Sequence, residues 1–153
     1  MDFRLTEDQL QLKEAARRYA RERLPEVAAR LEETNEGVSR ELLAEFASMG
    51  FLAINVPESL GGLGLGNLEA LLVLEEFGRI SSAVAFPLFE SCVGPVRAIE
   101  RFGDPKLAAE VVPAVARGEK VIAVSMSEPQ AGSALTDLKT RAEIKGEIGR
   151  AHV

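Results

Sequence analysis

Apolar residues recur at helical spacing over the first two thirds of the chain. The sequence Thr6-Glu7-Asp8-Gln9 is a capping box, because the Thr6 hydroxyl can accept the Gln9 amide hydrogen and the Gln9 side chain can reach back. The helix predicted to follow carries its core-facing side chains at Leu12, Ala15, Ala16 and Tyr19. We expect Pro25 to bend or interrupt this helix, and the helix to end near residues 35–37.

Two more helices are predicted between residues 39 and 78. Ser39 is a capping residue, and Gly50 suits a left-handed cap at the end of the helix that Ser39 starts. The apolar face of that helix contains Leu42, Leu43, Phe46 and Ala47. Asn67 is expected to cap the next helix, which ends at Gly78.

Proline divides the next apolar stretch. Residues 81–102 have a mostly helical pattern that we expect Pro87 and Pro95 to break. Asp104 followed by a proline is a strong helix start, and the short helix it begins is expected to end before Pro113.

The pattern changes after Gly118. Residues 121–127 are rich in β-branched side chains and too few for a helix, and residues 140–144 are a second candidate strand. An isolated hairpin is not stable by itself, so we expect a β-domain to begin near residue 120 and to be truncated in this sequence. Residues 147–153 can be decoded from a common sequencing-adapter DNA in one frame, and we interpret them as a foreign tail that contains the sole histidine, His152.

Composition narrows the class of protein. The chain has 153 residues, a net charge of −6, 46% hydrophobic and 27% charged residues, which is typical of a folded globular domain. Its Lys and Arg residues are scattered among acids, so the basic patch of a nucleic-acid-binding protein is absent. No apolar segment approaches the roughly 20 residues of a membrane span, and the charged N-terminus differs from a signal peptide, so we expect a cytoplasmic protein.

The lone cysteine and the glycine-rich loop both favour structural interpretations. A single cysteine excludes an internal disulfide, and Cys92 has no histidine near it in sequence, so we interpret it as a small buried residue. Residues 61–66 superficially resemble a dinucleotide-binding turn. Their spacing, Gly62-x-Gly64-x-Gly66, is not the required G-x-G-x-x-G, and no βαβ alternation follows. A tight turn between helices is the favoured interpretation.

Residues 125–133 are the strongest candidate for chemistry. Serine hydroxyls and free backbone amides at a strand end can hydrogen-bond the rim of a heteroaromatic ring or a phosphate, and Gly132 permits close backbone approach. A plain polar loop would have the same composition, so the residue types alone leave both interpretations open.

Family resemblance favours the first interpretation. The segment Ser127-Glu128-Pro129-Gln130-Ala131-Gly132-Ser133 resembles the T-E-P-x-A-G-S-D signature of acyl-CoA dehydrogenases. Other landmarks of the family occur in order at Leu5-Thr6-Glu7-Asp8-Gln9, Met49-Gly50-Phe51, Val56-Pro57-Glu58-Ser59-Leu60-Gly61-Gly62-Leu63-Gly64, Leu74-Glu75-Glu76-Phe77-Gly78, Arg101-Phe102-Gly103-Asp104 and Gly118-Glu119-Lys120. The resemblance covers nearly the whole chain before the tail.

This resemblance implies a fold and a reaction. The fold is mainly α, with an orthogonal or up-down helical N-terminal domain at residues 1–119 and the first strands of an incomplete β-barrel-like middle domain at 120–146. The reaction is FAD-dependent: a carboxylate removes the α-proton of an acyl-CoA thioester, the β-hydrogen leaves as hydride, and a trans-2-enoyl-CoA results. Electrons pass to an electron-transfer flavoprotein, tetramers are usual, and the setting is fatty-acid metabolism and lipid degradation.

The resemblance also assigns residues to the cofactor and the substrate. It implies that Val124 and Met126 line the flavin, and that the Ser127 hydroxyl bonds near flavin N5 and O4. Gly132 and Ser133 approach the FAD pyrophosphate, and Ser133 also contacts the CoA part of the substrate. Phe86, Pro87 and Glu90 fall where the family closes the far end of the acyl pocket. No metal is implied.

Two departures bear on activity. Ala134 replaces the family's usual Asp, so a contact in that loop is lost or replaced. The family's catalytic glutamate belongs to a C-terminal domain that this sequence lacks, so no catalytic residue is assigned and the fragment is expected to be inactive; Glu128 is a motif residue, not the base. The alternatives are a flavoprotein of the same fold with other chemistry, such as a flavin monooxygenase, and a non-enzymatic helical interaction module.

Overall fold

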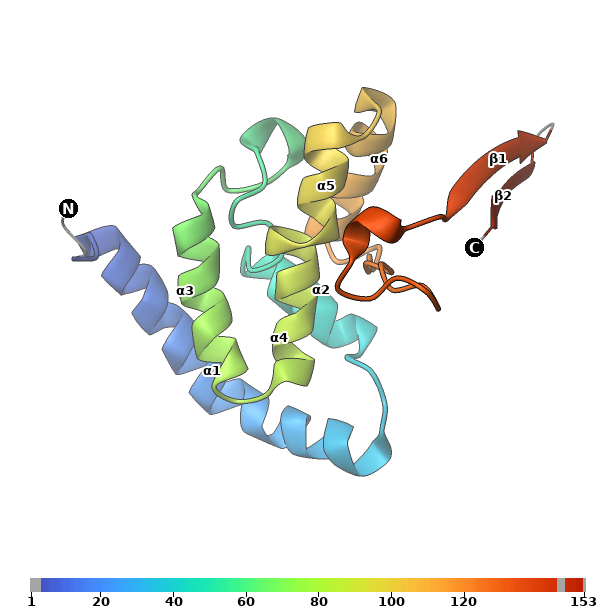
Figure 1. The fold of residues 1–153 in the computed structure, drawn as a ribbon. Coiled ribbons are helices and arrows are strands. Elements are labelled where there is room, and N and C mark those ends of the chain that lie inside the picture. The colour runs from blue at the N-terminus through green and yellow to red at the C-terminus, as the bar shows by residue number, and fades with distance from the viewer. Residues whose placement is uncertain (1–3, 146–147, 153) are drawn as a thin grey trace. The chain divides into compact units, whose positions relative to one another are not determined.

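The computed structural model is mainly α-helical and describes residues 4–145 and 148–152, with the backbone alone described from residue 144 onward (Figure 1). The chain divides into two compact units, which we call the helical unit, residues 1–123, and the terminal unit, residues 124–153. Among the described residues, no helix has both the length and the apolar character that crossing a membrane requires.

The first helix, α1 (Glu7–Thr34), begins at the predicted capping box and ends at Asn35 in a left-handed conformation. The Gln9 amide donates to the Thr6 hydroxyl at 3.3 Å, and the Thr6 amide donates to the Gln9 side chain at 2.9 Å. The prediction that Pro25 interrupts the helix was wrong, because α1 continues through it. Pro25 lies on the exposed side, and the buried residues Leu24 and Val27 on either side of it hold both halves against the same core.

Helix α2 (Arg40–Ser48) starts where predicted, with the Ser39 hydroxyl accepting the Leu42 amide hydrogen at 3.3 Å. Gly50 follows in the left-handed region, with φ of 77°. Residues 51–56 then form turns, and all six are buried. A 3₁₀ turn, η1 (Glu58–Leu60), follows them and leads into the glycine-rich loop.

The glycine-rich loop folds back on this buried segment. The amides of residues 63, 64 and 65 donate to the carbonyls of residues 53, 56 and 54 at 2.9, 2.9 and 3.0 Å. A Cβ at Gly62 would lie only 2.0 Å from the Val56 carbonyl oxygen, so only glycine fits there. This geometry supports a structural turn and gives the loop no dinucleotide-binding shape.

The next helices differ from prediction in their ends. In α3 (Asn67–Gly78) the cap is Gly66 and not Asn67, whose side chain instead accepts a hydrogen bond from Asn55 at 2.8 Å. Pro87 does not break α4 (Ser82–Leu88), which continues into a π-helical turn, η2 (Phe89–Val93). Pro95 does mark a boundary, as the first residue of α5 (Pro95–Phe102).

Helix α6 (Pro105–Ala116) begins at Asp104 as predicted, but the expectation that it ends before Pro113 was wrong. Val112 and Val115, on either side of that proline, are both buried, so packing maintains the helix despite one missing amide. The helix is closed by Gly118, with φ of 71°; a Cβ there would lie 2.8 Å from the Leu43 carbonyl oxygen.

The larger core lies where α1, α3 and α4 pack together (Figure 1). Phe77 of α3 is its centre: the ring is fully buried and lies 5.3 Å from Phe46, 5.1 Å from Phe51 and 5.7 Å from Tyr19 between centroids. A second, smaller core joins residues 53–56 to α5 and α6.

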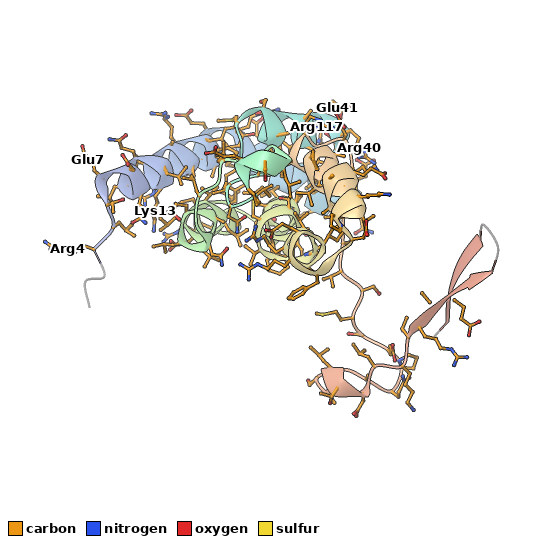
Figure 2. All side chains as sticks on the ribbon, turned by 90° about the horizontal axis from the view of Figure 1, so that it is seen from above. Arg4, Glu7, Lys13, Arg40, Glu41 and Arg117 are labelled. Carbon is orange, nitrogen blue, oxygen red and sulfur yellow. The ribbon has the colours of Figure 1, made fainter. Side chains whose placement is uncertain are left out.

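Ion pairs connect α1 to α3 beside the larger core. Glu76 is only 2% exposed, and the Arg17 guanidinium donates to both of its oxygens at 3.1 Å. Lys13, which points from α1 toward α3 (Figure 2), lies 2.6 Å from Glu75. Hydrogen bonds from Lys13 and Arg79 lower the pKa of Glu75 to about 2. This polar network fixes the register of α1 along α3.

The terminal unit holds little regular structure before its end. The strand predicted at residues 121–127 is absent, because no described segment pairs with it. The second candidate strand is confirmed as β1 (Arg141–Lys145), which pairs antiparallel with β2 (Ile148–His152). β2 falls in the segment interpreted as a foreign tail, and that origin stays a prediction.

Glu128 organises the loop that precedes β1. Its carboxylate accepts the amide hydrogens of Lys139 at 2.9 Å and Thr140 at 2.7 Å, and also bonds the Thr140 hydroxyl and the Gln130 side chain. The bond from the Thr140 hydroxyl and the Lys139 amide hold the pKa of Glu128 below its ordinary value of 4.5. Glu128 therefore closes the loop containing the 3₁₀ turn η3 (Leu135–Asp137).

Replacing the centre of the larger core tests its role. We expect Phe77→Ala to lower the free energy of unfolding by about 3–5 kcal/mol, because the cavity it leaves is enclosed on all sides. The matched control is Phe102→Ala, whose ring is 86% exposed and whose loss should cost under about 0.5 kcal/mol. Urea denaturation followed by circular dichroism measures both; equal losses would contradict this account of the core.

Lowering the pH tests the Glu128 contacts. The pKa of Glu128 is lower in the folded protein than its unfolded value of 4.5. The hydrogen bonds of the charged carboxylate therefore stabilise the loop fully above pH 4.5, and this stabilisation is lost as the pH falls through the folded-state pKa. Protection factors of the Lys139 and Thr140 amides in hydrogen exchange should therefore drop in acid, and should be low at neutral pH in Glu128→Gln. Asp137→Asn removes a carboxylate from the same loop and should leave them unchanged; protection independent of both pH and Glu128 would refute the role.

Candidate functional site

A tight turn in the terminal unit connects two of the predicted cofactor residues, Ser127 and Gly132. Glu128 and Ala131 exchange backbone hydrogen bonds of 2.9 and 3.0 Å, so Ser127 and Gly132 leave the turn side by side. The Ala131 side chain is buried beneath the turn. The residues that the family resemblance assigned to the flavin are all exposed: Val124, Met126, Ser127, Gly132 and Ser133.

The polar groups of this turn are available to a ligand. None of the described residues hydrogen-bonds the hydroxyl of Ser127 or Ser133, or accepts from the amide of Gly132. A Cβ built at Gly132 meets no atom within 4 Å, and its φ is not in the left-handed region, so the chain's own packing does not require glycine. Glycine at this position leaves the backbone open to close approach by another group. Uncharged donors of this kind fit a flavin ring edge and a pyrophosphate.

Glu128 does not have the geometry of a catalytic base. Both of its oxygens accept hydrogen bonds from residues 139 and 140, and these bonds stabilise the charged form. A general base must instead reach the proton it removes with a free oxygen. The structure thus supports the interpretation of Glu128 as a motif residue.

The residues predicted to close the acyl pocket line a cavity of about 370 Å³ in the helical unit. Phe86, Pro87 and Glu90 lie on successive turns of α4 and η2, and face the cavity together with Ser91. The remaining wall is mostly apolar and comes from distant segments: Gly37, Val38, Leu43, Leu52, Val115 and residues 120–123. Sequence reasoning missed these residues because nothing local distinguishes them from ordinary core positions.

Most polar groups of this cavity are already engaged. The Ser91 hydroxyl donates to the Pro87 carbonyl at 2.8 Å. The Lys120 ammonium lies 2.8 Å from Glu110, which keeps the pKa of that carboxyl below its ordinary value. Oxygen Oε2 of Glu90 is different: it is buried and has no hydrogen-bond partner among the described residues. Such an atom is costly to bury, which makes Glu90 the notable polar feature of the cavity.

Cys92, one turn from this cavity, is a structural residue. Its side chain is 2% exposed and its sulfur donates to the Phe51 carbonyl at 3.4 Å. Burial raises the pKa of the Cys92 thiol, so the reactive thiolate is disfavoured. The interpretation of Cys92 as a small buried residue is confirmed.

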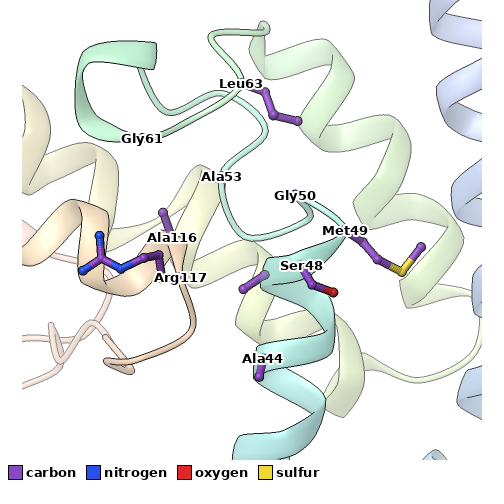
Figure 3. Close-up of a pocket in the computed structure, with 10 residues that line it drawn as sticks. Ala44, Ser48, Met49, Gly50, Ala53, Gly61, Leu63, Ala116 and Arg117 are labelled. Atoms are coloured by element: carbon purple, nitrogen blue, oxygen red, sulfur yellow. The ribbon is translucent and has the colours of Figure 1, made fainter.

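A second, more open hollow lies between the end of α2, the glycine-rich loop and the end of α6 (Figure 3). Its walls are mainly small or apolar, as at Ala44, Ala53 and Leu63. Arg117 alone of the ten lining residues is charged, and it forms two 2.8 Å hydrogen bonds with Glu119. The hollow therefore presents no unpaired charge to a ligand.

The start of α2 and the end of α6 are also connected directly. Arg40, which Figure 2 labels, donates to the Glu119 carbonyl at 3.2 Å. This bond holds Glu119 against the start of α2, directly before residues 120–123, which form one wall of the 370 Å³ cavity.

Comparison with known proteins places the chain in a family. Residues 6–119 match the family model "Acyl-CoA dehydrogenase, N-terminal domain". Mitochondrial isovaleryl-CoA dehydrogenase from Bos taurus is 35% identical over 144 residues, which are 94% of this chain and 34% of that protein. The chain thus spans about a third of that relative's length.

Solved structures of the same family have a similar fold. A glutaryl-coenzyme A dehydrogenase in complex with glutaryl-CoA superposes with a TM-score of 0.87 at 27% identity, covering 99% of this chain and 39% of the other. The FAD complex of PigA superposes with a TM-score of 0.81 at 29% identity, covering 93% and 37%. On the strength of the family model, which covers most of its length, this chain belongs to the acyl-CoA dehydrogenase family.

Proposed function

We propose that this chain is the N-terminal part of an FAD-dependent enzyme that dehydrogenates acyl-CoA thioesters to trans-2-enoyl-CoA. The observation that carries the proposal is the exposed donor edge at Ser127, Gly132 and Ser133, where hydroxyls and an amide have no partner among the described residues. The free space at Gly132 supports it, since a side chain there would block a ligand and not the protein itself.

Each residue of the edge has a distinct role in this proposal. FAD, when bound, supplies the acceptor for the hydride that leaves the β-carbon. The Ser127 hydroxyl donates a hydrogen bond to the ring edge near N5 and O4, while Val124 and Met126 provide apolar contact to the ring. The Gly132 amide and the Ser133 hydroxyl donate to the pyrophosphate, and Ser133 also contacts the CoA part of the substrate.

Glu128 supports this edge without taking part in proton transfer. Its bonds to residues 139 and 140 close the loop, so the donors at 127, 132 and 133 are held in place before a ligand arrives. The α-proton is removed by a carboxylate that the described residues do not provide. Electrons leave to an electron-transfer flavoprotein.

The remaining parts of the proposal concern the whole protein. The cavity beside Phe86 and Glu90 holds the acyl chain, because it is apolar and has the volume of a small-molecule site. The complete protein is a homo-oligomer, in keeping with the family's usual tetramers, and works in fatty-acid breakdown. Its cytoplasmic location stays a prediction from the sequence.

The serine hydroxyls provide the direct test. In the full-length protein, we expect Ser127→Ala with Ser133→Ala to weaken FAD binding about tenfold or more, because two hydrogen bonds to the cofactor are lost. Fluorescence titration of the apoprotein with FAD measures the affinity. Ser82→Ala, an exposed serine on α4, is the control and should leave it unchanged. Equal FAD affinity in the double variant and the wild type would overturn the assignment.

The missing base gives a second test. We expect the 153-residue chain, supplied with FAD and an acyl-CoA, to reduce no electron acceptor, because none of its described carboxylates is placed as a base beside the donor edge. The full-length protein under the same conditions is the positive control. Acyl-CoA oxidation by the 153-residue chain would show that the base lies within it.

A further inference from the structure

The side chain of Glu128 bridges the two ends of its loop. Among the described residues, no backbone hydrogen bond runs between residues 124–133, which contain the donor edge, and residues 139–145, which contain β1. Oxygen Oε2 of Glu128 accepts the Lys139 amide hydrogen at 2.9 Å, and Oε1 accepts the Thr140 amide hydrogen at 2.7 Å. The hydrogen bonding that connects the donor edge to β1 therefore passes through this one carboxylate.

Thr140 gives that carboxylate a donor that depends on residue type. Its hydroxyl also bonds Oε1 of Glu128, and because a charged carboxylate only accepts, the hydroxyl is the donor. Any residue except proline supplies a backbone amide, whereas a short hydroxyl at position 140 requires serine or threonine. The Gln130 side chain bonds Oε2 as well, but it belongs to the turn itself and does not connect the turn to β1.

These bonds together fix how the carboxylate is turned. Oxygen Oε1 accepts two hydrogens from Thr140, and Oε2 accepts one each from Lys139 and Gln130, so the lone-pair sites of the carboxylate are filled. The carboxylate cannot rotate without breaking bonds on both oxygens. Because Thr140 directly precedes β1 and Ser127 directly precedes Glu128, the orientation of the carboxylate passes from the strand to the donor edge.

We propose that Thr140 is a positioning residue for the FAD site: its hydroxyl sets the orientation of Glu128, and Glu128 in turn sets where Ser127 and Gly132 present their donors. The inference rests on the proposed function, because it takes those donors to bind FAD. Thr140 acts only through Glu128 and makes no contact with the cofactor. Without its hydroxyl the turn is ordered only when FAD binds, and that ordering lowers the affinity.

The shape of threonine provides the competing explanation. A β-branched side chain is favoured in and beside strands, and Thr140 lies next to β1. A role based on shape is kept by valine and lost by serine. A role based on the hydroxyl is lost by valine and kept by serine, so the two substitutions at position 140 give opposite results under the two explanations.

Titration of the full-length apoprotein with FAD, followed by fluorescence, provides the test. We expect Thr140→Val to weaken FAD binding about fivefold or more, because it keeps the shape and removes one hydrogen bond to a charged group. Thr140→Ser should stay within about twofold of the wild type, because the donor remains. The matched control is Thr136→Val. Thr136 lies exposed in the same loop, its hydroxyl has no partner among the described residues, and its replacement should leave the affinity unchanged.

A double-mutant cycle with Glu128→Ala shows whether Thr140 acts through Glu128. If it does, adding Thr140→Val to Glu128→Ala weakens FAD binding by no more than about a further twofold, whereas independent effects would multiply. Circular dichroism of every variant identifies any loss of folding. Thr140→Ser keeps the proposal open to refutation even if Thr140→Val unfolds the terminal unit, because only the shape-based role predicts weaker binding in that variant.

The outcomes separate two failures. This inference alone is overturned if Thr140→Val binds FAD as tightly as the wild type, if Thr140→Ser binds it as weakly as Thr140→Val, or if the losses in the cycle multiply. A wild-type full-length protein that binds no FAD overturns the proposed function, and the inference with it.

Discussion

The helical unit depends on burying a segment that has no helix or strand. Residues 51–56 are completely enclosed, and a backbone carbonyl in such a place must find a donor. The glycine-rich loop supplies amides to the carbonyls of residues 53, 54 and 56. Arg97 donates to the carbonyl of Asn55 at 2.8 Å, and Cys92 donates to that of Phe51. Three separate parts of the chain therefore meet the hydrogen-bonding needs of this segment.

This buried segment also joins the two cores and one wall of the candidate site. Phe51 and Ile54 belong to the larger core, while Ala53 and Val56 belong to the smaller one. Leu52, between them, lines the cavity that contains Glu90. The position of α4 and η2 relative to α2, and with it the shape of the proposed acyl site, follows from how these residues are packed.

In the terminal unit, the carboxylate of Glu128 holds the local structure together. Glu128 gathers hydrogen bonds from residues 11 and 12 positions away, and the turn from 128 to 131 then presents Ser127 and Gly132 together. A signature motif can thus combine residues that contact a ligand with one that shapes the loop. The substitution of Ala134 for the family's Asp leaves the Glu128 contacts in place.

Local sequence determined the features that local chemistry controls. The capping box at Thr6, the Ser39 cap, the helix start at Asp104 and the left-handed glycine at position 50 are all as predicted, because a cap involves residues three or four apart. Family membership was likewise evident from ordered short motifs.

Tertiary packing decided the rest. Pro25 was expected to bend or interrupt α1, and α6 was expected to end before Pro113. Both helices continue through the proline, because buried residues on both sides of it outweigh the one lost hydrogen bond. Residues 121–127 have strand propensity but no described partner, and a strand exists only through pairing. The lone carboxylate in the cavity was equally hidden, since burial and the lack of a partner are properties of surroundings drawn from distant parts of the chain.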